Sequence, residues 1–388
     1  MKKDTKSLPI HRSVDDVLIR PQYTELSSRS HVSVSVDLDK FPTSISLPLT
    51  PSNMSSIQTE ELLIGCLNRR TLTILHRFMS VNENTLLYKK LYNYCIEYKI
   101  NTMLLGVSVG VGVLEVNRAL ALMSCGARTI LIDVAHGAQR KVVEMCRKIR
   151  ESRNGDKVFL IVGNFANVES IKKFEHECFT AGIKLPDMYK VGIGGGSVCK
   201  TRVKTGSGEP HFESVLECSR EGYNVICDGG VKTPGDVAKM IAAGAKLVMS
   251  GALYAKTYES RKFKDENKYV ASLLIIFLMF AYNLFYFNLL NVILLLLAYL
   301  LTHKLFGKEN YKGSAFLAAP TGFKTSEGGE VTVNQNMTLR EMFDDVEGGL
   351  RSALTYSNSP TLEDFSRNAI FINVSSSTAK RNDVHNNG

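Results

Sequence analysis

A glycine-rich stretch that ends in a cysteine is the part of the sequence that most clearly suggests chemistry. Residues 191–200 read VGIGGGSVCK, so four glycines, a serine and Cys199 fall within eight residues, directly after an apolar run. Glycines at that density let the backbone approach a phosphate, an ion or a flat base. A cysteine at the end of such a loop serves packing, metal binding or nucleophilic attack, and the loop alone does not decide among these.

The composition narrows the class of protein and of ligand. The 388 residues are 44% hydrophobic and 22% charged, which is ordinary for a globular protein. The formal net charge is +9, but the basic residues are scattered, without an arginine-rich block or interleaved aromatic residues. An anionic small substrate explains the positive net charge as well as a nucleic acid does. We therefore do not expect nucleic-acid binding.

The eight cysteines are spread widely, with no CxxC pair and no Cys/His cluster at zinc spacing. The N-terminal sequence MKKDTKSLPIHRS lacks an apolar signal core. We therefore expect the protein to lie in a reducing, cytoplasmic compartment, with its thiols free. We interpret most of the cysteines as small buried apolar residues.

Eight short apolar runs, each followed by a helical pattern, must position the glycine loop. Apolar strands that alternate with helices indicate a parallel sheet covered on both faces, and eight units between Ser44 and Ala255 favour a closed (β/α)₈ TIM barrel. An open dinucleotide-binding sheet is the alternative, and it would carry the motif G-x-G-x-x-G after a strand. In this sequence Ser197 occupies the position of the third glycine of that motif. The runs are SISLPLTPSNM, LTILHRF, TMLLGVSVG, TILIDVAHG, VFLIVGNFA, MYKVGIGGG, NVICDGG and KLVMSGALYA.

In a barrel, the carboxyl ends of all eight strands meet at one face, where such folds carry their chemistry. The glycine loop follows the sixth strand and therefore lies at the mouth of the expected site. The side chains and loops expected to converge there are Met54, His76, Asp133, the Gly194 loop, Asp228 and Gly251.

A series of motifs in this order resembles the IMP dehydrogenase/GMP reductase family. The resemblance runs from about residue 8 to residue 255 and resumes from about residue 304 to residue 372. It implies a barrel enzyme that acts on purine nucleotides. The motifs are DDVLIRP, NM at 53–54, LHRFMSVNE, LIDVAHG, KVGIGGGSVCKTR with KTGSGEP, ICDGGVKTPGDVAKMIAAGA and VMSGALYA.

The resemblance assigns catalytic roles. Cys199 matches the family nucleophile, which attacks C2 of the purine, and amide groups of a glycine loop can lower a thiol pKa as this requires. Thr201, two residues after Cys199, and Glu327, in the motif TSEGG, match a Thr–Glu relay of the reductases. In those enzymes the relay supplies the proton with which ammonia leaves.

The resemblance also implies a nucleotide site. Asp228 would take both ribose hydroxyls, and amide groups at Gly230 and Gly251 would hold the phosphate. The full set of implied substrate contacts is Met54, Ser197, Asp228, Gly229, Gly230, Gly251, Ala252, Tyr311 and Gly313.

Cofactor and cation contacts follow by the same resemblance. Asp133 would face the nicotinamide ribose of NADPH, and Arg77 stands where the reductases have a lysine, so its charge is kept but an acid role is in doubt. Backbone carbonyls of Gly194, Gly196 and Cys199 correspond to a K⁺ site, although Gly195 replaces the usual proline.

Two observations favour a reductase over a dehydrogenase. Residues 311–327 are few and contain no Arg-Tyr pair, and no regulatory domain interrupts the barrel. We therefore expect NADPH-dependent reductive deamination of GMP to IMP and ammonia. The alternatives are an IMP dehydrogenase, which converts IMP to XMP with NAD, and a catalytically impaired nucleotide-binding relative tethered to a membrane.

Residues 270–301 form an uncharged apolar run that does not fit the family pattern. Its length suffices to span a bilayer, so a membrane-anchoring hairpin, an oligomer-burying helical insertion and an accidental insertion are the three interpretations. The expected organisation is an N-terminal segment (1–43), barrel core (44–260), apolar insertion (261–303), flap with closing helix and strand (304–374) and disordered tail (375–388). The resemblance also implies a homotetramer.

Overall fold

The computed structural model describes residues 10–196, 199, 201–260, 308–312 and 330–375. Its centre is a sheet of eight parallel strands in the order β2-β9-β8-β7-β6-β5-β4-β3. The eight runs predicted from the sequence are therefore the eight strands. Their bounds are β2 Leu49–Pro51, β3 Thr73–Leu75, β4 Leu105–Val109, β5 Thr129–Asp133, β6 Phe159–Phe165, β7 Met188–Val191, β8 Val225–Asp228 and β9 Leu247–Ser250.

The two ends of the sheet, β2 and β3, meet and bring the strands nearly into a closed barrel. Gln58 joins them: its Nε2 donates to the carbonyl of Ile74 at 2.7 Å, and its Oε1 accepts from the amide of His76 at 2.9 Å. The hydroxyl of Thr50 on β2 also donates to the carbonyl of Leu72. The predicted (β/α)₈ fold is confirmed, and the open-sheet alternative is wrong.

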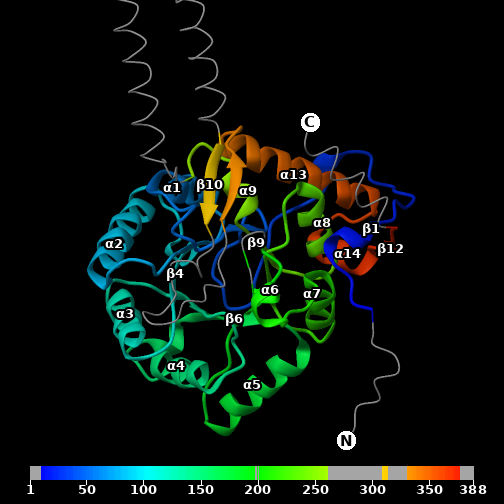
Figure 1. Ribbon diagram of the computed structural model, residues 1–388. Coiled ribbons are helices and arrows are strands. Elements are labelled where there is room, and N and C mark those ends of the chain that lie inside the picture. The colour runs from blue at the N-terminus through cyan, green and yellow to red at the C-terminus, as the bar shows by residue number, and fades with distance from the viewer. Residues whose placement is uncertain (1–9, 197–198, 200, 261–307, 313–329, 376–388) are drawn as a thin grey trace, which may run out of the picture.

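The strands are apolar because both of their faces are covered. All five residues of β4 are buried, and so are Ile130 and Ile132 on β5 and Val248 on β9, none of which is exposed at all. A parallel sheet surrounded by helices needs such continuous apolar runs, which is the pattern that the sequence shows. Figure 1 shows the helices as a ring around the strands.

Several helices begin at residues whose side chains cap them. Ser80 and Glu83 form a reciprocal capping box at the start of α2, and Thr233 and Asp236 do so at α8. The helix bounds are α1 Glu60–Asn68, α2 Val81–Glu97, α3 Val113–Ser124, α4 Arg140–Arg150, α5 Val168–Thr180, α6 Thr201–Thr205, α7 His211–Arg220, α8 Pro234–Ala242, α9 Ala252–Ala255, α13 Leu339–Tyr356 and α14 Leu362–Asn368.

Segments from both ends of the chain pack together beside the barrel. Strand β1 (Val17–Ile19) pairs antiparallel with β12 (Phe371–Asn373), and both lie near α8 and α14 in Figure 1. A second antiparallel pair joins β10 (Lys308–Lys312) to β11 (Glu330–Asn334). The ion pair from Arg12 to Glu213, at 2.7 Å, attaches the N-terminal segment to α7.

Within the described part of the chain, no helix is both long and apolar enough to cross a membrane. The apolar run 270–301, on which the membrane hairpin and the helical insertion were predicted, lies outside the described residues, and so does the tail from residue 376. No observation on the described residues supports a membrane tether. The expected domain boundaries stay predictions.

Candidate active site

A buried lysine joins two aspartates at the carboxyl ends of the strands. The Nζ atom of Lys190 on β7 lies 2.8 Å from Oδ1 of Asp133 and 2.6 Å from Oδ2 of Asp228. Asp133 is the last residue of β5 and Asp228 the last residue of β8. The Lys190 side chain is only 3% exposed, so the two carboxylates are its partners in place of water. Two predicted site residues are thereby brought together.

The charges of this cluster support one another. Burial alone would lower the pKa of Lys190, but attraction to Asp133 and Asp228 outweighs it, so that pKa lies above its ordinary value. Burial alone would raise the pKa of Asp133, but Lys190, with smaller contributions from Asn53 and Arg77, holds it below its ordinary value. Lys190 is therefore protonated and Asp133 ionised at neutral pH.

Two asparagine amides complete the cluster. Nδ2 of Asn164, on β6, lies 2.8 Å from Oδ2 of Asp228 and 2.6 Å from the carbonyl of Gly192, to both of which it donates. Nδ2 of Asn53, just after β2, donates to Oδ2 of Asp133 at 2.8 Å. Lys190, Asn164 and Asn53 were not predicted from the sequence. For Lys190 and Asn164 a signal was present, because each is a polar residue within a largely apolar strand.

Cys199 is half-buried at the end of the glycine loop. Its amide donates to the carbonyl of Gly196 at 2.9 Å, and its thiol lies 3.2 Å from the hydroxyl of Thr201, to which it donates. Thr201 is the first residue of α6, so the start of this helix places the hydroxyl beside the sulfur. Six of the other seven cysteines are buried: Cys66, Cys95, Cys146, Cys178, Cys218 and Cys227.

Glycines allow the loops after β7 and β8 to lie backbone against backbone. Gly192 has φ +143°, and a methyl group on it would lie 2.2 Å from the carbonyl oxygen of Asp228. Gly229 has φ +90°, and a methyl group there would lie 3.1 Å from the amide nitrogen of Gly196. Any side chain at either position would separate the loop that carries Cys199 from the loop that carries Asp228.

His76 and Arg77 follow β3 at the same face. His76 is buried, and its Nδ1 accepts from the amide of Phe78 at 3.1 Å. The guanidinium of Arg77 lies 5.0 Å from the Phe78 ring centroid, and its charge contributes to the lowered pKa of Asp133. Within the described residues, its Nε atom is buried without a hydrogen-bond partner. Arg77 therefore has a donor left for a ligand.

The remaining predicted contacts divide into described and undescribed residues. Met54 follows β2 and packs partly buried against the core. Directly after β9, Gly251 is the N-cap of α9 and Ala252 is its first residue. The Ser250 hydroxyl donates to the carbonyl of Val231 at 3.0 Å, which joins the loops after β8 and β9. Four predicted contacts lie outside the described part of the chain, namely Ser197, Gly313, Glu327 and the side chain of Tyr311 on β10. Their positions in the site stay predictions.

No group of three or more His, Cys, Asp or Glu side chains that could hold a metal ion occurs among the described residues. The predicted K⁺ ligands Gly194, Gly196 and Cys199 do share one loop. The carbonyl of Gly196 already accepts the amide of Cys199 at 2.9 Å. No observation supports the cation itself.

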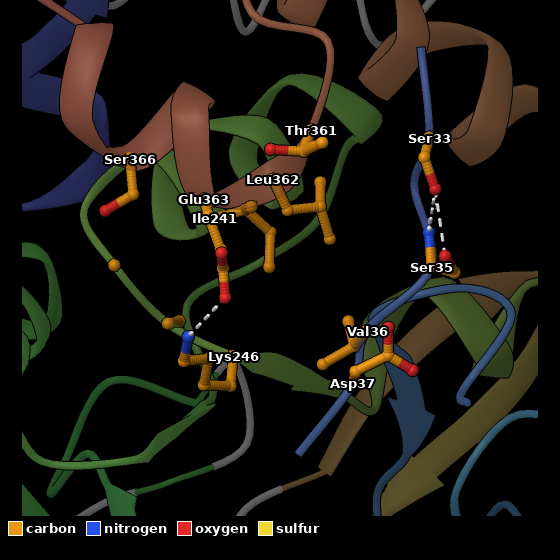
Figure 2. Close-up of a pocket in the computed structure, with 12 residues that line it drawn as sticks. Ser33, Ser35, Val36, Asp37, Ile241, Lys246, Thr361, Leu362, Glu363 and Ser366 are labelled. Carbon is orange, nitrogen blue, oxygen red and sulfur yellow. Dashed lines mark hydrogen bonds and ion pairs between the residues drawn. The ribbon is translucent and has the colours of Figure 1, made fainter. Parts of the chain in front are cut away.

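A pocket of about 210 Å³ lies at the other end of the barrel (Figure 2). It is lined by the N-terminal segment from Ser33 to Asp37, by the junction of α8 with β9, where β9 begins, and by the start of α14. Lys246 and Glu363 face one another across it at 3.8 Å. None of the predicted site residues lines this pocket, so it is separate from the cluster around Lys190.

The described elements define a (β/α)₈-barrel protein whose polar cluster and half-buried thiol lie at the carboxyl ends of its strands. A family model, the IMP dehydrogenase / GMP reductase domain, matches residues 12–266. The chain therefore belongs to the IMP dehydrogenase/GMP reductase family, as its motifs predicted.

Individual relatives agree with this assignment. A GMP reductase of Buchnera aphidicola subsp. Baizongia pistaciae is 31% identical over 373 residues, which cover 93% of each chain. A GMP reductase of Onchocerca volvulus is 29% identical over 381 residues, 94% of this chain and 91% of the relative. The crystal structure of a Trypanosoma brucei GMP reductase in complex with guanosine 5'-monophosphate has a TM-score of 0.75 at 19% identity, with 98% of both chains covered, which shows the shared fold.

Proposed function

We propose that this protein is a GMP reductase, which converts GMP and NADPH to IMP, ammonia and NADP⁺. One observation carries the proposal: the thiol of Cys199, half-buried and 3.2 Å from the Thr201 hydroxyl, ends the glycine loop that packs against the Asp228 loop. Relatives named GMP reductase that match over more than nine-tenths of the chain support the same activity.

Cys199 would act as the nucleophile. Its thiolate forms a bond to C2 of the purine, the bond from C2 to the exocyclic amino group breaks, and ammonia leaves with a proton supplied through Thr201 and Glu327. Bound NADPH would supply the hydride that C2 then receives. The bond from sulfur to C2 breaks with its electron pair returning to Cys199, and IMP is released. The contact of Thr201 with the sulfur supports this role, while Glu327 rests on the resemblance alone.

Asp228 would hold the ribose. The hydrogen bonds that Asp228 accepts from Lys190 and Asn164, within the described residues, both go to Oδ2. Oδ1 is therefore left for a ribose hydroxyl. Amide groups of the Gly229–Gly230 turn and of Gly251 would bind the phosphate, with Met54 and Ala252 beside the nucleotide.

The residues present fit a nicotinamide cofactor. The buried Nε donor of Arg77, which lacks a partner within the described residues, suits an acceptor on NADPH. Asp133 is ionised, and it would accept from a hydroxyl of the nicotinamide ribose. Arg77 would bind and orient the cofactor through its guanidinium donors.

Three further expectations stay predictions, the first two from the resemblance and the third from the cysteine usage. The carbonyls of Gly194, Gly196 and Cys199 offer hard oxygen atoms of the kind that K⁺ prefers. The second prediction is a homotetramer, and the third is a cytoplasmic location.

The activity is tested by following NADPH absorbance with GMP, and separately NADH formation from IMP and NAD⁺. We expect GMP-dependent NADPH oxidation that is abolished in Cys199→Ser. Formation of NADH from IMP would favour the dehydrogenase instead, and GMP binding without turnover would favour the impaired relative. A chain that lacks residues 270–301, assayed beside the full chain, reports whether the apolar run limits the activity.

A further inference from the structure

A buried histidine lies beneath the two glycine loops of the site. His211 is the first residue of α7, and it is only 5% exposed. Neither of its ring nitrogens has a partner at hydrogen-bond geometry within the described residues, although the backbone of Ile193 and of Gly229 faces the ring. A buried imidazole whose nitrogens reach the neighbouring backbone only at poor hydrogen-bond geometry is costly, so its place here needs an explanation.

The ring fills the space between the loop after β7 and the loop after β8. A methyl group on Gly195 would lie 2.2 Å from Cε1 and 2.5 Å from both ring nitrogens of His211. Methyl groups on Gly192, Gly229 and Gly230 would lie 3.1, 3.3 and 3.4 Å from ring atoms. The imidazole therefore touches the backbone of both loops, and at Gly195 it leaves no room for any side chain.

This contact gives a physical reason for an unusual residue. Gly195 stands where the family resemblance leads us to expect a proline, and a proline has ring atoms where the imidazole of His211 lies. With His211 in place, glycine is the one residue type that position 195 accepts without a displacement of the loop. Gly195 and His211 are thus complementary in size.

We propose that His211 is a positioning residue that sets the spacing between the Cys199 loop and the Gly229–Gly230 loop, and that Gly195 is the residue that admits its ring. The His211 ring lies against the backbone of Gly195, Gly229 and Gly230, on the loops that lead to the reacting sulfur and to the predicted phosphate contacts. It acts through the backbone of the loops that carry them. The kinetic part of this inference rests on the proposed reductase activity.

The charges around the ring keep it a neutral spacer. Burial lowers the pKa of His211, and the charge of Arg202 on α6 adds to this effect, while the backbone of Gly229 and the charge of Asp228 oppose it. The net result is a pKa below the ordinary value, so the ring is uncharged at neutral pH. Because the ring is neutral, the positive charge that pairs with Asp228 comes from Lys190.

A double-mutant cycle tests the size complementarity. The variants are Gly195→Ala, His211→Ala and the double variant, with Gly348→Ala on α13 as control, because a methyl group there meets nothing within 4 Å. The first readout is the alkylation rate of Cys199 by iodoacetamide, measured by peptide mass spectrometry, which needs no turnover. The second is kcat and KM for GMP-dependent NADPH oxidation.

We expect Gly195→Ala to change the alkylation rate and kcat by about tenfold, and the double variant to recover most of that change. If Gly195→Ala does not fold and the double variant does, the proposal is also supported. Additive effects would overturn it, as would a His211→Ala protein with a lower melting temperature but unchanged alkylation rate and kcat. If the unaltered protein lacks GMP-dependent turnover, the proposed function fails, while the alkylation cycle still decides on His211.

Discussion

The ammonium group of Lys190 lies 2.6 Å from Oδ2 of Asp228, inside the barrel and at the end where the Cys199 loop begins. The same Nζ atom reaches Asp133, which ends β5, so one lysine fixes carboxylates from two other strands. Because Asp133 is predicted to face the cofactor and Asp228 the substrate ribose, Lys190 couples the two halves of the proposed site. Its own charge is needed to keep two carboxylates close together.

Replacement of Lys190 by methionine should therefore affect folding and binding together. The variant leaves two carboxylates without their cation in a largely buried place, which costs about 3 kcal/mol or more of the free energy of unfolding. Chemical denaturation measures this loss, and the GMP-induced shift in melting temperature measures binding. Lys190→Arg is the control, because it keeps the charge. An unchanged free energy of unfolding in Lys190→Met would show that the ion pairs contribute nothing.

Asn164 should be needed as a hydrogen-bond donor rather than for its volume. Asn164→Asp keeps the shape but places a carboxylate against Asp228 and against the carbonyl of Gly192, both of which need a donor. We expect loss of about 2 kcal/mol of stability and a weaker GMP effect on the melting temperature. Asn164→Leu, which adds no charge, should lose less. Equal losses in the two variants would contradict this reading.

The sequence predicted most of the fold because each strand is apolar over its whole length. The regular alternation of apolar strands with helical patterns indicated the barrel. The pairing of β1 with β12 could not be predicted in the same way. Local patterns do not specify which distant segments meet, and these two strands are separated by almost the whole chain.

The site was predicted in part. Asp133 and Asp228 end their strands at the expected face, and Cys199 and Thr201 lie in the loop after β7 and at the start of α6. Lys190 was missed because its partners, Asp133 and Asp228, lie on other strands. The sequence around MYKV gives no indication of them. His211 was missed because its role depends on the absence of a side chain at Gly195, a three-dimensional fit that spacing along the chain does not encode.

Stability should depend on pH through His211. Its pKa in the folded protein lies below the ordinary value of about 6.5, so between these two values the unfolded chain binds more protons than the folded one. The free energy of unfolding therefore falls as the pH drops below about 6.5, and the decline ends once the pH is below the folded-state pKa.

Urea unfolding at about pH 7.5 and at about pH 5.5 measures this dependence. His211→Gln should show a smaller decrease between the two conditions than the unaltered protein. His176→Gln on α5 is the control, since that side chain is exposed, and it should leave the decrease as it is. An equal decrease in His211→Gln and the unaltered protein would show that another group is responsible.

The cysteines should differ sharply in reactivity, because burial acts on most of them and Cys199 is half-buried. Burial raises the pKa of Cys95 to about 11 and that of Cys218 to about 12, so at neutral pH these thiols are both shielded and protonated. Iodoacetamide should alkylate Cys199 in the folded protein well before it alkylates either of them. Denaturation should remove the difference.

Peptide mass spectrometry over time gives each rate, and saturating GMP should protect Cys199 if the nucleotide occupies the mouth of the barrel. Cys125 is the informative internal control, because it is also half-buried but lies at the end of α3, away from the strand carboxyl ends. Its rate should not respond to GMP. If Cys199 reacts as slowly as Cys95, its sulfur is not accessible to a purine ring, and the covalent mechanism loses its nucleophile.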